Sequence, residues 1–185
     1  MEFIITYSGE EFIPVKPDIN KIHIEDIAHS LSLMCRGNGH IDYFFSVAQH
    51  SINCTNEAKA RGCTARVQLI CLLHDASEAY ISDITRPVKF YLNEYKEIER
   101  HLQGVIYTKF LGEVPTEDEI NFLDQIDNEM LVVELSVLMA NKNIYTTIPK
   151  LRSTPSLDFK PHSDVETEYL KVYYGIMHAG LIQGR

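Results

Sequence analysis

His74 and Asp75 stand side by side at the end of the apolar run LICLL, and both have side chains that bind metal ions. His50 precedes this pair by 24 residues, and Asp127 follows it by 52. A polar or charged group on an apolar helix face costs free energy unless a suitable partner meets it. Two imidazoles and two carboxylates can hold a borderline to hard divalent ion with open positions for water or substrate. The sequence therefore predicts a metal centre that can support a reaction, rather than a closed structural zinc site.

Each of these side chains also has an ordinary structural explanation. A single histidine on an apolar helix face is more often a core residue, because buried polar groups persist when they are hydrogen-bonded. The adjacent His74 and Asp75 alone equally suit the polar end of an amphipathic helix. Such positions on three different helices favour the metal centre.

Helices are expected to position these side chains, because apolar residues recur at steps of three and four along most of the chain. The spacing predicts helices over residues 24–34, 42–61, 65–80, 94–111, 116–141 and 165–181. Before residue 18 we expect an extended arm or a small hairpin around Ser8 and Gly9, and residues 142–163 should form a long surface loop. Thr116 and Glu119 form a plausible capping box at the start of the fifth helix. The pattern indicates an all-α fold.

Length and composition fit one domain over residues 1–185, with its core at about residues 22–141. The 185 residues are 45% apolar and 23% charged, which suffices for a hydrophobic core without disulfides. A net charge of -9 argues against nucleic acid and against an anionic membrane surface as partners. The four cysteines show no C-x-x-C spacing, which fits a reducing cytoplasm. We expect neither a secretory signal nor a membrane-spanning helix.

The order His, His-Asp, Asp resembles the signature of the HD superfamily of metal-dependent phosphohydrolases. Within that superfamily, the stretch HDASEAYISDITRPVKFY is similar to the segment that marks the bacterial 5′-deoxynucleotidase branch and its phage-associated relatives. The stretch SVAQHS around His50 also resembles that branch, and the similarity extends from about Ile24 to Glu134. It implies a compact helical bundle, often dimeric, that hydrolyses nucleotides.

The resemblance also implies roles for individual residues. One divalent ion (Co, Mn, Fe, Zn or Mg) is expected on His50, His74, Asp75 and Asp127. Glu78 matches the acid that positions or deprotonates the attacking water, and Asp83 matches a second acid near the sugar or the leaving oxygen. Arg36 matches an arginine that grips phosphate. Arg86 and Lys89 are further candidates for phosphate contacts, and a solvated lysine after a turn explains Lys89 equally well.

One position departs from the branch. Relatives with nucleoside monophosphatase activity commonly carry a large aromatic residue after the arginine, whereas this chain has Gly37 and no tryptophan. The resemblance therefore does not imply sugar discrimination by an aromatic side chain here. Arg86 stands at a position where an uncharged residue is expected in relatives, so a second phosphate contact from it would widen the choice of substrates toward triphosphates.

The leading expectation is a (deoxy)nucleoside 5′-monophosphatase that is a cytoplasmic homodimer. A dNTP triphosphohydrolase would use the same metal centre, and a cyclic-nucleotide phosphodiesterase fits less well because a second metal motif is missing. Outside the enzymes, the alternative is a nucleotide-binding regulator that lost turnover. The intact motif favours an enzyme over that regulator.

Overall fold

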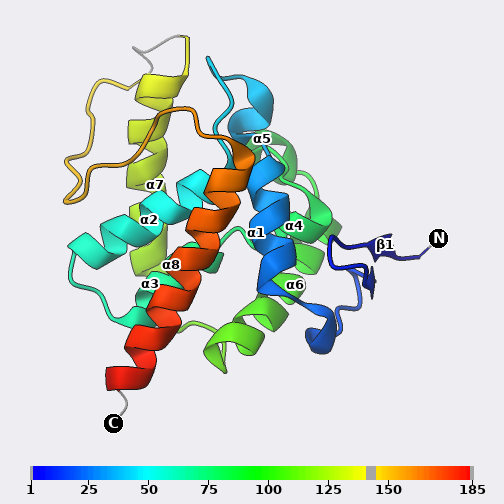
Figure 1. Ribbon diagram of the computed structural model, residues 1–185. Helices are drawn as coiled ribbons and strands as arrows, with labels where there is room; N and C mark the ends of the chain where they lie inside the picture. Colours follow the sequence, from blue (N-terminus) through cyan, green and yellow to red (C-terminus); the bar gives the residue numbers. More distant parts are fainter. Residues whose placement is uncertain (1, 141–144, 184–185) are drawn as a thin grey trace.

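A computed structural model describes residues 2–140 and 145–183 and is mostly helical (Figure 1). The chain opens with an antiparallel hairpin of β1 (Ile4–Ile5) and β2 (Glu11–Phe12). The later elements are η1 (Ile19–Lys21), α1 (Ile24–Leu33), η2 (Arg36–Gly39), α2 (Val47–Ala60), α3 (Ala65–Leu73), α4 (Glu78–Ile81), α5 (Arg86–Lys89), α6 (Asn93–Leu111), α7 (Glu117–Leu138) and α8 (His162–Gln183). The all-α expectation and the N-terminal hairpin are confirmed.

Helix α2 begins at Val47, not near residue 42 as the sequence pattern predicted. Ser46 caps it, because the Ser46 hydroxyl accepts the Gln49 amide at 3.1 Å and the Gln49 side chain accepts the Ser46 amide at 3.2 Å. The capping box expected at Thr116 and Glu119 is present at the start of α7. The last helix starts at residue 162 instead of 165.

The helix expected over residues 65–80 is divided into α3 and α4 by a turn at residues 74–77. Amides in this turn bond to carbonyls three residues back, which is the tighter 3₁₀ pattern. Gln103 of α6 holds the turn, donating to the Leu73 carbonyl at 2.7 Å and accepting the Ser77 amide at 3.0 Å. The segment that follows α4 contains the short helix α5.

Helices α2 and α3 form the centre of the fold. Both contact α7 and α8, and α1 packs against α2 and α8 (Figure 1). Every residue from Leu69 to Leu73 is buried, as expected for a helix that neighbours cover on several sides. Tyr169 of α8 is fully buried and donates its hydroxyl to the Leu72 carbonyl at 2.8 Å. This packing fixes the end of α3, where the adjacent histidine and aspartate begin.

Residues 150–158 lie along α2 and are bonded to it, so this loop is more than a surface connection. Glu57 accepts the Ser153 amide at 2.7 Å and the Arg152 amide at 3.0 Å. Asn53 exchanges two hydrogen bonds with the Ser156 backbone, at 3.0 and 3.1 Å. We call residues 150–158 the α2 strap.

Residues 142–144 of the expected loop lie outside the described residues. Within the described part of the chain, no helix is long and apolar enough to cross a membrane.

Candidate metal centre and substrate cavity

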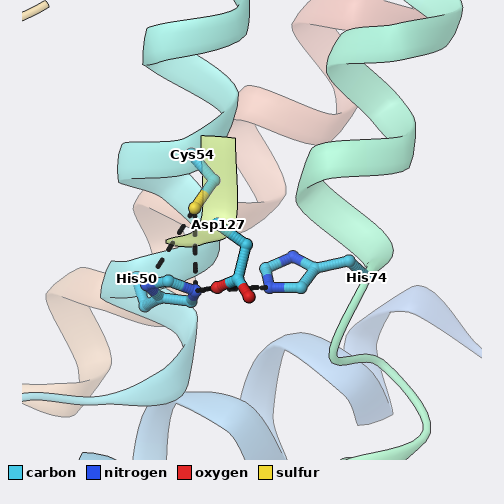
Figure 2. Close-up of side chains that lie close together, drawn as sticks. All are labelled: His50, Cys54, His74 and Asp127. Atoms are coloured by element: carbon cyan, nitrogen blue, oxygen red, sulfur yellow. Dashed lines mark hydrogen bonds and ion pairs between the residues drawn. The ribbon is translucent and has the colours of Figure 1, made fainter. Parts of the chain in front are cut away.

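Four side chains from α2, α7 and the turn after α3 converge at one point: His50, Cys54, His74 and Asp127 (Figure 2). The Nε2 atoms of His50 and His74 are 3.2 Å apart. The Oδ1 atom of Asp127 lies 3.0 Å from Nε2 of His50 and 3.8 Å from Nε2 of His74. The Oδ2 atom of Asp75 lies 3.2 Å from Nε2 of His74. The structure therefore brings the predicted ligands His50, His74 and Asp127 to one point, whereas Asp75 lies beside His74 and outside this group of four.

These separations fit a shared divalent ion. Ligand atoms bonded at about 2.1 Å lie about 3.0 Å apart at right angles and about 3.4 Å apart in a tetrahedron. The distances between the nitrogen and carboxylate atoms, 3.0 to 3.8 Å, fall around these values. Two imidazoles with two carboxylates suit an ion of the Mn, Fe, Co or Zn type and also accept Mg. The residues present thus fit the metal that the sequence predicted.

Cys54 stands one helical turn after His50, and its Sγ approaches that ring. The sulfur lies 3.6 Å from Nε2 and 3.9 Å from Nδ1 of His50, so it sits over the ring (Figure 2). Burial raises the pKa of the Cys54 thiol. Cys54 thus packs against a predicted ligand, and its sulfur belongs to the group of four side chains close enough to share an ion, a position that was not predicted from the sequence.

Both histidines are oriented through Nδ1. His74 Nδ1 lies 2.8 Å from the Cys71 carbonyl oxygen, which fixes Nδ1 as the donor and leaves Nε2 free to bind a metal. His50 Nδ1 lies 2.9 and 3.0 Å from the two carboxylate oxygens of Glu134, a buried residue of α7. The apolar periodicity of this helix includes Glu134 in its stripe, but we predicted no role for it from the sequence. Its position seven residues after Asp127 on that stripe is the signal that would have identified it.

All the predicted catalytic and phosphate-binding side chains line one cavity of about 290 Å³ beside the ligands: Arg36, Glu78, Asp83, Arg86 and Lys89. Asp75 and Asp127 form part of its wall, and Leu131, Leu135 and Leu138 supply an apolar side. A groove of about 700 Å³ between α2, α3 and α8 is larger, but it contains none of the predicted site residues. The smaller cavity is the one that combines ligands, acids and cations.

Glu78 is the most unusual acid in the cavity. Its side chain is buried, and Oε2 has no hydrogen-bond partner among the described residues. Burial, followed by the charges of Asp75 and Asp83, raises the pKa of Glu78 well above its ordinary value. That pKa, about 10, keeps Glu78 protonated at neutral pH, so it can take a proton from water only when a bound cation offsets the charges of Asp75 and Asp83. The catalytic roles of Glu78 and Asp83 stay predictions.

The ligand carboxylates have the opposite behaviour. Burial alone would raise the pKa of Asp75, but His74, His50 and Arg36 hold that pKa far below its ordinary value. Burial would likewise raise the pKa of Asp127, and the hydrogen bond and charge of His50 lower it instead. Both groups are therefore ionised at neutral pH, the state in which a carboxylate binds a cation.

The three cations differ in how firmly they are held. Arg36 lies in η2 with 15% of its side chain exposed, 3.6 Å from both Asp75 and Glu134. Arg86 is 66% exposed and donates to Asp127 Oδ2 at 3.1 Å. Lys89 is paired with Glu99 at 2.7 Å. All three can reach a ligand in the cavity, and only Arg86 has most of its surface in solvent.

Comparison with known proteins agrees with this site. Residues 35–126 match the family described as HD domain. The chain is 41% identical over 110 residues to "Uncharacterized protein YfdR" of Escherichia coli K12, covering 60% of this chain and 59% of that protein. It is 38% identical over 109 residues to an uncharacterized protein of Rhodobacter capsulatus, covering 56% of this chain and 55% of that one. The chain thus spans somewhat more than half the length of these curated relatives.

Residues 35–126, just under half of the chain, are therefore similar to an HD domain. His50, His74 and Asp75 fall inside the matched residues, and Asp127 is the first residue after them.

Proposed function

We propose that this protein is a divalent-metal-dependent nucleotide phosphohydrolase that converts (deoxy)nucleoside 5′-monophosphates to nucleoside and phosphate. The observation that carries the proposal is the shared cavity, in which the predicted ligands Asp75 and Asp127 meet three cations and three further acids. An ion-binding site alone is compatible with many functions. Cations and unused acids beside it match what a phosphate ester requires of an enzyme.

The residues divide the work of hydrolysis between them. A divalent ion, when bound, supplies Lewis acidity that activates water and neutralises charge on the phosphoryl oxygens. Arg36 and Arg86 donate to the remaining phosphate oxygens, for which the guanidinium fork is well shaped. Glu78 accepts a proton from the attacking water, whose oxygen forms the new bond to phosphorus. The bond from phosphorus to the 5′-oxygen breaks, and the proton taken by Glu78 passes to that leaving oxygen, beside which we place Asp83.

The size and lining of the cavity favour a monophosphate. A volume of about 290 Å³ lies at the lower end of the range for small-molecule sites, which begins at about 300 Å³. The leucines of α7 offer an apolar surface to a sugar or base in the same cavity. A triphosphate would have to extend beyond this volume.

A dNTP triphosphohydrolase is the second candidate, and the exposure of Arg86 favours it. With 66% of its side chain in solvent, Arg86 can meet phosphate groups that project out of the cavity. The two candidates differ in product, since one releases inorganic phosphate and the other tripolyphosphate.

The test is a panel of nucleoside mono-, di- and triphosphates incubated with the purified protein and Mn²⁺ or Co²⁺. We expect inorganic phosphate from monophosphates, and tripolyphosphate from triphosphates would select the second candidate. The Asp75→Asn variant should abolish hydrolysis, whereas Asp124→Asn, an exposed change on α7, should not. Hydrolysis at the parent rate by Asp75→Asn would place the activity elsewhere. Nucleotide binding without any turnover would indicate a regulator.

A further inference from the structure

Glu134 holds two parts of the site at once. Its carboxylate is 2% exposed and lies 2.9 and 3.0 Å from Nδ1 of His50. The same carboxylate lies 3.6 Å from the Arg36 guanidinium. A carboxylate buried to this degree needs such partners, because an unpaired charge in the interior is costly. Glu134 also lines the cavity, where its carboxylate faces Arg36, and it meets the metal centre through the ring of His50.

The contact with His50 leaves Nε2 as the ring nitrogen that faces the other ligands. An imidazole that binds an ion through Nε2 keeps its hydrogen on Nδ1, and the Glu134 carboxylate lies 2.9 Å from Nδ1, where it can accept that hydrogen. Nε2 is the atom that lies 3.0 Å from Asp127 and 3.2 Å from His74. His74 reaches the same state through a neutral carbonyl. A carboxylate partner makes an imidazole a more basic ligand than a carbonyl partner does.

The contact with Arg36 links this orientation to the cation in the cavity. The two terminal nitrogens of the Arg36 guanidinium face different acids. Nη1 lies 3.6 Å from Asp75, and Nη2 lies 3.6 Å from Glu134. Arg36 is thus positioned between a metal ligand and the residue that orients another ligand. Its side chain lines the cavity, where it can reach a bound anion.

We propose that Glu134 is the positioning residue of this centre, setting the tautomer of His50 for the ion and the place of Arg36 for the phosphate. The second half of this inference rests on the proposed function, whereas the first half requires only that the site binds a metal. Mn²⁺ affinity tests the first half and phosphate affinity tests the second, so either half can be refuted without the other.

The first experiment titrates Mn²⁺ into the unmodified protein, Glu134→Gln and Glu129→Gln by calorimetry. Glu129 is the matched control, since it lies on the same helix and pairs with Arg61 outside the cavity. We expect Glu134→Gln to weaken Mn²⁺ binding by about 10- to 100-fold, the usual effect of losing a carboxylate that orients a metal-bound histidine. Glu129→Gln should bind as the parent does. Equal affinity in all three proteins overturns the first half.

The second experiment does not depend on a variant that must fold. Two-dimensional proton–nitrogen NMR of the unmodified protein with bound Zn²⁺ should show His50 as the pure Nδ1–H tautomer, and any other tautomer overturns the assignment. Inorganic phosphate is then titrated into the Mn²⁺-loaded proteins. Phosphate should bind at least several-fold more weakly to Glu134→Gln than to Glu129→Gln at saturating Mn²⁺, and equal binding overturns the second half. A parent protein that binds Mn²⁺ and phosphate but hydrolyses no nucleotide refutes the proposed function and leaves this inference standing.

Discussion

Glu57 offers a sharp test of how α2 is held in place. This carboxylate is fully buried, and it accepts the Arg152 amide, the Ser153 amide and hydroxyl, and the Arg61 side chain at 2.6 to 3.0 Å. Burial alone would raise the pKa of Glu57, but these bonds lower it from 4.5 to about 2. The α2 strap is therefore attached to the helix that carries His50 through an ionised acid.

The sign of the pH dependence follows from that lowered pKa. The stabilisation by Glu57 is complete above its unfolded-state pKa of 4.5 and disappears as the pH falls towards about 2. A shift of this size corresponds to about 3 kcal/mol in the free energy of unfolding, of which about 2 kcal/mol is lost between pH 6 and pH 3. Glu57→Gln cannot titrate, so its deficit relative to the parent should shrink by that amount over the same range.

Urea unfolding followed by circular dichroism at pH 6, 5, 4 and 3 measures this deficit. A chelator in every sample removes any contribution from bound metal, and the other acids cancel because both proteins share them. Glu97→Gln, an exposed change on α6, is the control for the loss of one surface carboxylate. A Glu57→Gln deficit that is the same at pH 6 and pH 3 would refute the reasoning, because it would mean that the bonds to the strap do not depend on the charge.

Other consequences are testable with simpler measurements. Mn²⁺ at 100 times its dissociation constant should stabilise the parent by about 2.7 kcal/mol in thermal unfolding, and Asp127→Asn should lose this effect. Gln103→Leu removes both bonds that hold residues 74–77 and should cost about 2 kcal/mol in urea unfolding while weakening Mn²⁺ binding. Arg86→Ala should change the free energy of unfolding by less than about 1 kcal/mol, because Arg86 is exposed, yet raise the Michaelis constant for the nucleotide.

The helical fold and the ligand faces were predictable because a period of 3.6 residues assigns each position to a face. His50 shares its stripe with Val47, Cys54 and Ala58, and all four are buried as the pattern requires. The break after Leu73 was not predictable in this way, because the apolar pattern continues through it. The turn is held by Gln103, a residue 30 positions away on α6, and no local signal reports such a contact.

The α2 strap was not predictable for a related reason. A segment rich in Pro, Ser and Thr predicts a loop but says nothing about where its amides find acceptors. Here the acceptors are Glu57 and Asn53, two polar residues buried on a helix face that periodicity alone assigns to the core. Each buried polar residue on such a face implies a partner elsewhere in the chain. Glu134 lies in the apolar stripe of α7, so the same reasoning predicts that its carboxylate has a buried partner, which is His50 in the structure.

The two carboxylates of α7 show why their spacing matters. Asp127 and Glu134 are seven residues apart, which is about two turns and about 10.5 Å along the helix axis. They nevertheless reach opposite nitrogens of one imidazole, His50, at 3.0 and 2.9 Å. This is possible only when the ring lies between the two turns and both side chains converge on it from the same face. A shorter side chain at position 134 would withdraw its carboxylate by about one carbon–carbon bond, about 1.5 Å, and break the contact. An aspartate followed by a buried glutamate seven residues later therefore predicts the orientation of the first histidine. Its Nδ1 faces the glutamate, and its Nε2 faces the metal centre.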